Sequence, residues 1–266
     1  MKQNEILPLG VFARINDEPA KIFKKIKDSG FTHCQLVSPP DEYLYSSEMT
    51  RKITDALKEN GVTVTSVFMS FKDQIWNYPK DAIATIGLVP PEWRAERIAR
   101  ACRIGNWAKE IGVDVLAAHV GFVPEDRNCE LYKKFIDAMK GLALFLKSNG
   151  QYFTFETGQE SVAVLENMFE DIGVDNLGIN FDPANLLMYD MDHPSALVEK
   201  LGRHVMHIHC KDGKRPAQKM TLGTETILGQ GDTDFENLLR KLFAMGYRGP
   251  LTIEREISGA QQDADI

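Results

Sequence analysis

The feature that most constrains the fold of this 266-residue chain is a regular alternation of short apolar stretches with longer amphipathic ones. The short stretches are rich in β-branched and aromatic residues and are bounded by turn-forming residues, which predicts strands. They are Leu7–Ile15, Thr32–Val37, Thr63–Met69, Val115–Val120, Tyr152–Thr157, Leu177–Asp182, Val205–Lys211 and Pro250–Arg255. The helices predicted between them are Pro19–Ser29, Thr50–Asn60, Glu92–Ile111, Asn128–Asn149, Ser161–Ile172, His193–Leu201 and Asp234–Met245. Eight strands alternating with helices predict an α/β fold, the (β/α)8 TIM barrel.

The alternation runs the whole length of the chain, so we expect one domain over residues 1–266. No low-complexity linker or change of composition marks a boundary. Only Ile257–Ile266 follow the last predicted strand, which are too few for a full helix, so the eighth helix should be short or missing. The long loop Ser70–Pro91 is either a lid over the barrel or a surface insertion, and the sequence leaves both open.

The composition limits the kinds of molecule and the kinds of site that we expect for this protein. The formal net charge is −7, whereas a nucleic-acid-binding surface usually carries a basic patch, so we expect no nucleic acid partner. The four cysteines are widely spaced and form no Cys-x-x-Cys pair, which disfavours a disulfide scaffold and a cysteine zinc site. The first residues lack the apolar core of a signal peptide and no run is long enough to span a membrane. We therefore expect a cytoplasmic protein, and a homo-oligomer is compatible with the sequence.

Four consecutive predicted strands each carry a residue of metal-ligand type near the C-terminal end. These residues are Glu156, Asp182, His209 and Glu254. Taken singly, each has an ordinary explanation: a strand-end Asp before Pro is often a turn-former, and a lone His is more often a core residue. In a barrel, however, the C-terminal ends of the strands form the active-site face, so the four side chains should converge. Carboxylates and an imidazole without cysteine suit a hard or borderline divalent cation, here Mn, Co, Mg or Zn.

Several segments carry a resemblance to a known family. They are Phe155-Glu-Thr-Gly158, Asn180-Phe-Asp-Pro-Ala-Asn185, His207-Ile-His-Cys-Lys-Asp212, Leu228-Gly-Gln-Gly-Asp-Thr-Asp-Phe235 and Gly249-Pro-Leu-Thr-Ile-Glu-Arg255, together with His119-Val-Gly-Phe-Val-Pro-Glu125. In order and spacing they resemble the xylose isomerase-like TIM barrel superfamily, and most closely its sugar (phosphate) isomerases and epimerases. The resemblance covers predicted strands four to eight, which is well over half of the chain.

The resemblance implies that Glu156, Asp182, His209 and Glu254 are the ligands of one divalent ion. It further implies that Glu156 and Glu254 are catalytic, because in the ketose 3-epimerases of this superfamily the two ligand glutamates also transfer the proton. The chemistry is consistent with this role. A divalent ion chelated by a ketone and its neighbouring hydroxyl stabilises an enediolate, and a carboxylate on each face of the carbon can remove and return the proton.

The resemblance also indicates substrate-binding residues. Arg215 lies where the ketose epimerases place an arginine that contacts substrate oxygens, and Lys211 is a second cation of the same loop. Asn185 occupies the position at which those epimerases carry a histidine, and His119 belongs to the motif of strand four. The alternatives are solvated surface charges for the two cations and core packing or support of the metal ligands for His119.

These observations favour a metal-dependent isomerase or epimerase that acts on a small carbohydrate or sugar phosphate through an enediolate. The alternative is a lyase or dehydratase of the same fold, acting on a keto-inositol or a 3-keto-sugar, since the first proton abstraction would be shared. Less favoured are an endonuclease IV-like phosphodiesterase, which needs more histidines and a basic face, and a sugar-binding barrel without catalysis. Gly229-Gln-Gly231 is a weak phosphate-loop signal that a turn before the next helix explains equally well.

Overall fold

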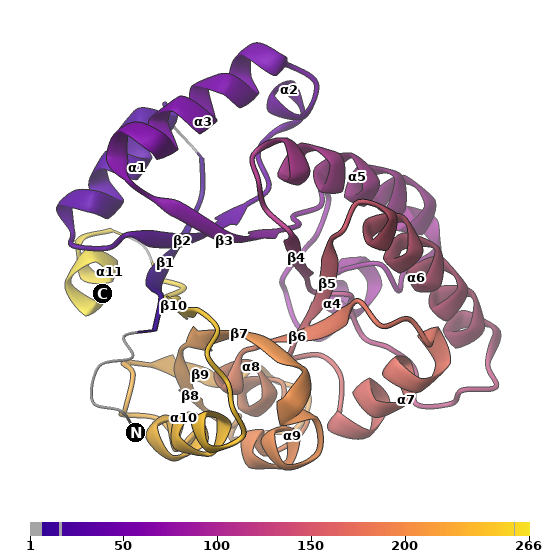
Figure 1. Cartoon of the computed structure of the whole chain (residues 1–266). Coiled ribbons are helices and arrows are strands. Elements are labelled where there is room, and N and C mark those ends of the chain that lie inside the picture. Colours follow the sequence, from indigo (N-terminus) through magenta and orange to yellow (C-terminus); the bar gives the residue numbers. More distant parts are fainter. Residues whose placement is uncertain (1–6, 16–17, 258) are drawn as a thin grey trace.

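The computed structural model of the chain describes residues 7–15, 18–257 and 259–266, and it contains a closed barrel of parallel strands (Figure 1). The barrel strands are β1 (Leu9–Ala13), β2 (His33–Val37), β3 (Thr63–Phe68), β4 (Val115–Ala118), β5 (Tyr152–Glu156), β6 (Leu177–Phe181), β7 (Val205–Cys210) and β10 (Leu251–Ile253). Each pairs with the strands before and after it, and β1 closes the ring by pairing with β10, with Leu9 opposite Leu251. The predicted TIM barrel is confirmed.

The helices between the strands surround the barrel (Figure 1). Seven of them lie at the predicted places: α1 (Pro19–Asp28), α3 (Ser47–Asn60), α5 (Pro91–Glu110), α6 (Glu130–Ser148), α7 (Val162–Ile172), α9 (Pro194–Leu201) and α10 (Phe235–Ala244). α3 begins earlier than predicted because Oγ of Ser46 accepts a hydrogen bond from the backbone N–H of Met49 and caps the first turn. Short helices that the sequence did not predict are α2 (Asp41–Leu44), α4 (Lys80–Thr85), α8 (Pro183–Met188), the 3-10 helix η1 (Gly202–His204) and α11 (Ala260–Asp265).

Alternation along each strand separates the helix-facing core from the barrel interior. In β5, the rings of Phe153 and Phe155 pack on each other, and Phe155 also contacts Phe169 of α7, with ring centroids 5.7 Å apart. The residues between and after them, Thr154 and Glu156, therefore face the inside of the barrel. The apolar positions of the strand thus hold the helix in place, and the polar positions are left for the interior.

Two features complete the C-terminal part of the chain. An antiparallel hairpin of β8 (Asp212–Lys214) and β9 (Thr224–Thr226) follows directly after β7, with Gly213 opposite Glu225. After β10, the predicted shortage of helix is confirmed, since α11 has only six residues. In Figure 1, α11 lies beside β1 and α1, where an eighth helix of the barrel would begin. No described helix is both long and apolar enough to cross a membrane.

Arginines of α5 hold the long segment between β3 and α5 in place through hydrogen bonds. The guanidinium of Arg97 is buried and donates hydrogen bonds to the carbonyl oxygens of Thr85, Gly87 and Lys72, at 2.6, 2.7 and 3.0 Å. Arg94 donates to the carbonyl of Leu88 at 2.8 Å. Leu88 and Val89 in turn donate their backbone N–H groups to the carbonyl of Val120, just beyond β4. The segment is therefore a fixed wall at the mouth of the barrel.

Candidate metal centre

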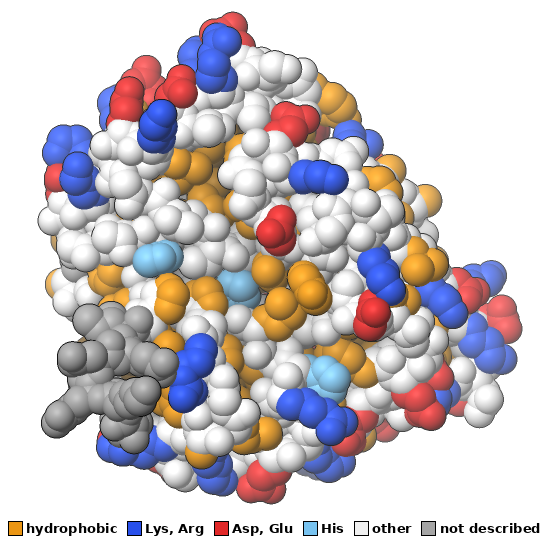
Figure 2. Space-filling view, in the orientation of Figure 1, with side chains coloured by type: hydrophobic (Ala, Val, Ile, Leu, Met, Phe, Trp, Pro, Cys, Tyr) orange, Lys and Arg blue, Asp and Glu red, His pale blue; other side chains and the backbone are white. Residues whose placement is uncertain are grey.

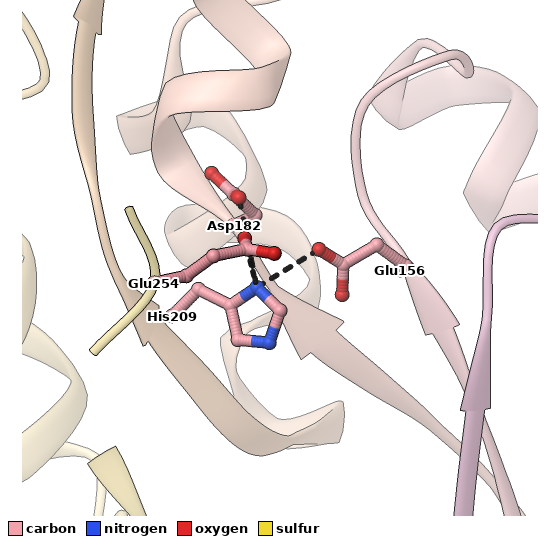
Figure 3. A group of neighbouring side chains, drawn as sticks. All are labelled: Glu156, Asp182, His209 and Glu254. Atoms are coloured by element: carbon pink, nitrogen blue, oxygen red, sulfur yellow. Dashed lines mark ion pairs between the residues drawn. The ribbon is translucent and has the colours of Figure 1, made fainter. Parts of the chain in front are cut away.

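Four side chains converge at the C-terminal ends of consecutive strands (Figure 3). Nδ1 of His209 lies 3.0 Å from Oε1 of Glu156 and 2.9 Å from Oε2 of Glu254. Oδ2 of Asp182 lies 3.6 Å from the same nitrogen. One ligand atom from each of the four residues lies within 4.8 Å of every other. The structure therefore brings together the four residues that were predicted to share an ion.

The local sequence explains why these side chains reach one point. Glu156 is the last residue of β5 and pairs with Asn180 of β6, while His209 in β7 pairs with Thr252 of β10. Glu254 directly follows β10, and Asp182 directly follows β6 and caps α8 by accepting the N–H of Asn185 at 2.9 Å. The parallel pairing of the strands thus places all four residues at the same end of the barrel.

The orientation of His209 is set from the other side of the barrel. Its Nε2 lies 2.5 Å from Oε1 of Gln35 in β2, and the amide nitrogen of Gln35 donates to Oγ of Ser66 in β3 at 2.6 Å. With its Nε2–H directed to a carbonyl oxygen, a neutral His209 presents the lone pair of Nδ1 to the carboxylates. The sequence analysis missed Gln35; a fully buried amide between Cys34 and Leu36 is the signal that would have indicated it.

The donor set fits a divalent cation. Oδ2 of Asp182 and Nδ1 of His209 are buried and make no hydrogen bond of regular geometry within the described part of the chain, although Oδ2 lies 3.3 Å from the ammonium of Lys211 and Nδ1 lies 2.9 to 3.0 Å from two carboxylates. Buried polar atoms normally have a partner, and the carboxylates of Glu156, Asp182 and the largely buried Glu254 repel one another unless a cation lies among them. The charged groups of the cluster also shift one another's pKa values. Burial raises the pKa of Glu156 to about 7, and for His209 the neighbouring Glu156 and Glu254 outweigh burial and raise its pKa.

Lys211 adds a cation beside the four ligands. Its buried ammonium lies 3.3 Å from both Oδ2 of Asp182 and Oε2 of Glu254, and 2.8 Å from Oε1 of Glu256. It also donates a hydrogen bond to Oδ1 of Asn185 at 3.1 Å. Burial alone would lower the pKa of Lys211, but the carboxylates, Asp182 first, raise it well above its ordinary value. Lys211 therefore stays charged at the centre.

A cavity of about 1030 Å³ opens above the cluster. Glu254, His119 and Asn185 line it, together with Trp76 and Tyr189. Nδ1 of His119 lies 2.9 Å from Oε1 of Gln159, and burial lowers the pKa of His119 to about 4, so the ring is neutral near pH 7. On this face of the molecule, hydrophobic side chains gather around the centre and charged ones lie chiefly at the periphery (Figure 2).

The predicted substrate-binding residues therefore occupy different places. His119 and Asn185 line the cavity, and Lys211 is buried against the metal-ligand cluster. Arg215 lies outside the cavity lining, partly exposed, and its guanidinium pairs with the carboxylate of Asp190. A contact of Arg215 with substrate stays a prediction.

The comparison with protein families agrees with the fold. Residues 23–266 match the family model described as xylose isomerase-like TIM barrel. The chain belongs to this family. Among curated relatives, an uncharacterized protein of Methanocaldococcus jannaschii is 27% identical over 164 residues, which is 56% of this chain and 53% of that protein. The chain spans about half or less of the length of the curated relatives it matches.

Solved structures of this family include a xylose isomerase domain protein of Planctomyces limnophilus, which is 34% identical with a TM-score of 0.91 over 97% of this chain and 93% of that one. A Mycobacterium smegmatis protein crystallised in complex with magnesium is 17% identical, with a TM-score of 0.71 over 94% of this chain and 90% of that one. Others, at 13–15% identity, are a 3-keto-D-glucoside 4-epimerase, a D-psicose 3-epimerase and a probable 3-DHS dehydratase. At identities this low, these likenesses show the fold alone.

Proposed function

We propose that this protein is a metal-dependent isomerase or epimerase of a small ketose, keto-sugar or sugar phosphate. One observation carries the proposal: two glutamates from different strands, Glu156 and Glu254, meet at one imidazole nitrogen, and Glu254 also lines a large cavity. Glu156, Asp182, His209 and Glu254 would hold one divalent ion, of which Mn, Co, Mg and Zn suit the mixed oxygen and nitrogen donors. The sugar-processing proteins of the same fold support a carbohydrate substrate.

The ion, when bound, would polarise the substrate carbonyl and so acidify the neighbouring C–H group. The two glutamates then supply what proton transfer needs. Figure 3 shows Glu156 and Glu254 reaching the site from different sides. One carboxylate removes the proton from the carbon beside the carbonyl, and the other returns a proton to the opposite face. Inversion of one stereocentre, or migration of the carbonyl, follows from where the proton is returned.

The residues around the glutamates would bind and orient the sugar. Oδ1 of Asn185 and the ammonium of Lys211 are joined by a hydrogen bond and lie at the edge of the ligand set, where substrate hydroxyl groups would lie. His119 offers a neutral imidazole on the cavity wall, suited to a hydrogen bond with a hydroxyl group. The aromatic side chains Trp76 and Tyr189 of the same wall would shield the reacting carbon from part of the solvent.

A lyase or dehydratase is the second candidate, favoured by the probable 3-DHS dehydratase among the structures of this fold. The first proton abstraction would be the same. The two reactions differ in whether the carbanionic intermediate is reprotonated or expels an oxygen at the β-carbon. Product analysis separates them, because elimination releases water and epimerisation conserves the mass of the substrate.

The experiment is a screen for solvent deuterium uptake by ketoses and keto-sugars, with and without phosphate, in the Mn-loaded protein. We expect uptake at a carbon next to the carbonyl for at least one of them. Glu156→Gln and Glu254→Gln should each lower the rate by a factor on the order of 10² to 10⁴. Glu236→Gln, on the exposed face of α10, is the matched control and should keep the wild-type rate. Equal rates in all four proteins would exclude the two glutamates as the proton-transfer pair.

A further inference from the structure

We propose that the substrate of this cavity is a neutral sugar that carries no phosphate group. The inference rests on the proposed function for its sugar chemistry, and it narrows the substrate class that the sequence leaves open. TIM barrels commonly bind the phosphate groups of their ligands at two places. Those places are the loops after the seventh and eighth strands, where backbone N–H groups and the N-terminus of a short helix face the ligand. In this chain the two loops follow β7 and β10.

The loop after β7 is already filled by a carboxylate of the protein. Oδ2 of Asp212 accepts the backbone N–H groups of Gly229 and Gly231, each at 3.0 Å. Oδ1 accepts the hydroxyl of Thr233 at 2.8 Å and its N–H at 3.2 Å, and also the N–H of Gly213. These are the donors that would otherwise cradle a phosphate. Asp212 is buried, so they are not free to turn to a ligand.

The glycines of this loop are explained by the same carboxylate. A Cβ atom on Gly231 would lie 2.1 Å from Oδ1 of Asp212, so only glycine permits the close approach of backbone and carboxylate. Gly229 has a φ of 83°, which also favours glycine. The glycines of Gly229-Gln-Gly231 therefore allow the backbone of the loop to bind the carboxylate of Asp212. This binding explains why the sequence resembles a phosphate-binding loop.

In the loop after β10, one backbone N–H group is bound by a carboxylate of the protein. The carboxylate of Glu225 in β9 accepts the backbone N–H of Glu256, with both oxygens within 3.2 Å. It also pairs with the guanidinium of Arg255 at 2.9 Å. Nε of Arg255 donates to Asp265 of α11 at 2.8 Å, so this arginine already faces two carboxylates. The hairpin of β8 and β9 thus delivers one carboxylate, Asp212 or Glu225, into each of the two loops.

The side-chain cations near the cluster are also neutralised. Lys211 contacts Asp182, Glu254 and Glu256, and a phosphate dianion that approached it would face these three carboxylates. Arg215 pairs with Asp190. Among the described residues that line the cavity, Arg14 is an exposed cation for which the structure gives no ion pair. Lys25 is a second exposed cation of this lining, so Arg14 and Lys25 are the residues that a phosphate could contact if the proposal were wrong.

The test measures phosphate binding directly, so it does not depend on turnover. Mg-loaded protein is titrated with inorganic phosphate, glycerol 3-phosphate and D-fructose 6-phosphate to roughly 10 mM, and the ³¹P line widths are followed at constant ionic strength. We expect no saturable broadening in the wild type, and the same result in Arg14→Gln. Saturable binding of one phosphate per chain would overturn the proposal, and its loss in Arg14→Gln or in Lys211→Met would identify the residue that binds the phosphate.

A catalytic comparison completes the test. D-fructose and D-fructose 6-phosphate are compared for deuterium uptake, together with D-xylulose and its 5-phosphate. Uptake by a neutral sugar and none by its phosphate supports the proposal, whereas a higher kcat/KM for a phosphate than for its neutral partner overturns it. If no sugar exchanges and the protein retains no metal, the proposed function fails, and the ³¹P titration still decides whether the cavity accepts a phosphate.

Discussion

Oε1 of Gln35 lies 2.5 Å from Nε2 of His209, although the two residues come from strands on different sides of the barrel. The contact fixes which nitrogen of His209 faces the carboxylates. A histidine that binds a metal commonly donates its other N–H to an oxygen in this way, and loss of the partner lowers metal affinity. Gln35 would thus support the candidate metal centre without contacting an ion bound there.

Removal of the Gln35 amide should therefore weaken the metal site. We expect Gln35→Met to lower the affinity for Mn by roughly 10-fold, because His209 loses the acceptor that orients its ring. The measurement is a Mn titration followed by electron paramagnetic resonance of the free ion. Gln230→Met, at an exposed loop position, is the control and should leave the affinity unchanged. An unchanged affinity in Gln35→Met would show that the ring is oriented by other contacts.

The wall at the mouth of the cavity should depend on Arg97. Lysine cannot reach the three carbonyl oxygens that the guanidinium contacts, so Arg97→Lys should destabilise the protein by about 2 kcal/mol. Backbone amides of residues 72–87 should then exchange with solvent at least 10-fold faster, at about 1.4 kcal/mol per tenfold change. Hydrogen exchange by mass spectrometry measures both effects.

The control for this prediction lies on the same helix. Arg103 of α5 stacks on the ring of Tyr45, with 5.6 Å from Cζ to the ring centroid, and contacts none of the three carbonyls. Arg103→Lys should therefore leave the exchange of residues 72–87 unchanged. Equal exchange in the two variants would contradict the view that Arg97 holds the segment.

Glu160 gives a prediction for the dependence of stability on pH. Burial, aided by the charge of Glu156, raises its pKa from 4.5 to about 8. The folded state therefore keeps a proton that the unfolded state loses, so this residue's contribution to stability is complete below about pH 4.5 and is lost as the pH rises to about 8. Glu160→Gln should be more stable than the wild type at pH 8 to 9, by a few kcal/mol at about 1.4 kcal/mol per pKa unit.

The advantage of Glu160→Gln should shrink toward pH 5, where the wild-type carboxyl is already protonated. Urea unfolding at several pH values measures the difference in free energy of unfolding. Glu236→Gln, exposed on α10, serves as the control and should show no such trend. A constant difference between wild type and Glu160→Gln across this range would contradict the raised pKa.

The barrel could be predicted because its signals are local. Each strand is recognisable in the sequence by its alternating apolar residues. In β5, Phe153 and Phe155 pack on the helix side, where Phe155 contacts α7, and Glu156 therefore faces the barrel interior. The four candidate ligands could be predicted for the same reason: each lies at the end of a recognisable strand, and parallel pairing brings strand ends together. No single one of these four residues would have been sufficient to predict a metal site.

The supporting contacts could not be predicted because they join residues far apart in the sequence. Gln35 and His209 are 174 residues apart, and their meeting follows from closure of the barrel. The hairpin of β8 and β9 lies in a polar stretch with no apolar alternation, so the role of Asp212 was not visible. The same stretch carries Arg215, whose pairing with Asp190 depends on how that loop folds back.

The most direct test of the account is the metal content of the purified protein. Wild type and the double variant Asp182→Asn with Glu254→Gln are dialysed against Mn and analysed by mass spectrometry, together with Glu160→Gln, a buried carboxylate outside the ligand set. We predict about one divalent ion per chain in wild type and in Glu160→Gln, and none in the double variant, because only Glu156 and His209 of the four donors would remain unchanged. No bound metal in the wild type after dialysis against Mn, or equal metal content in all three proteins, would contradict the account.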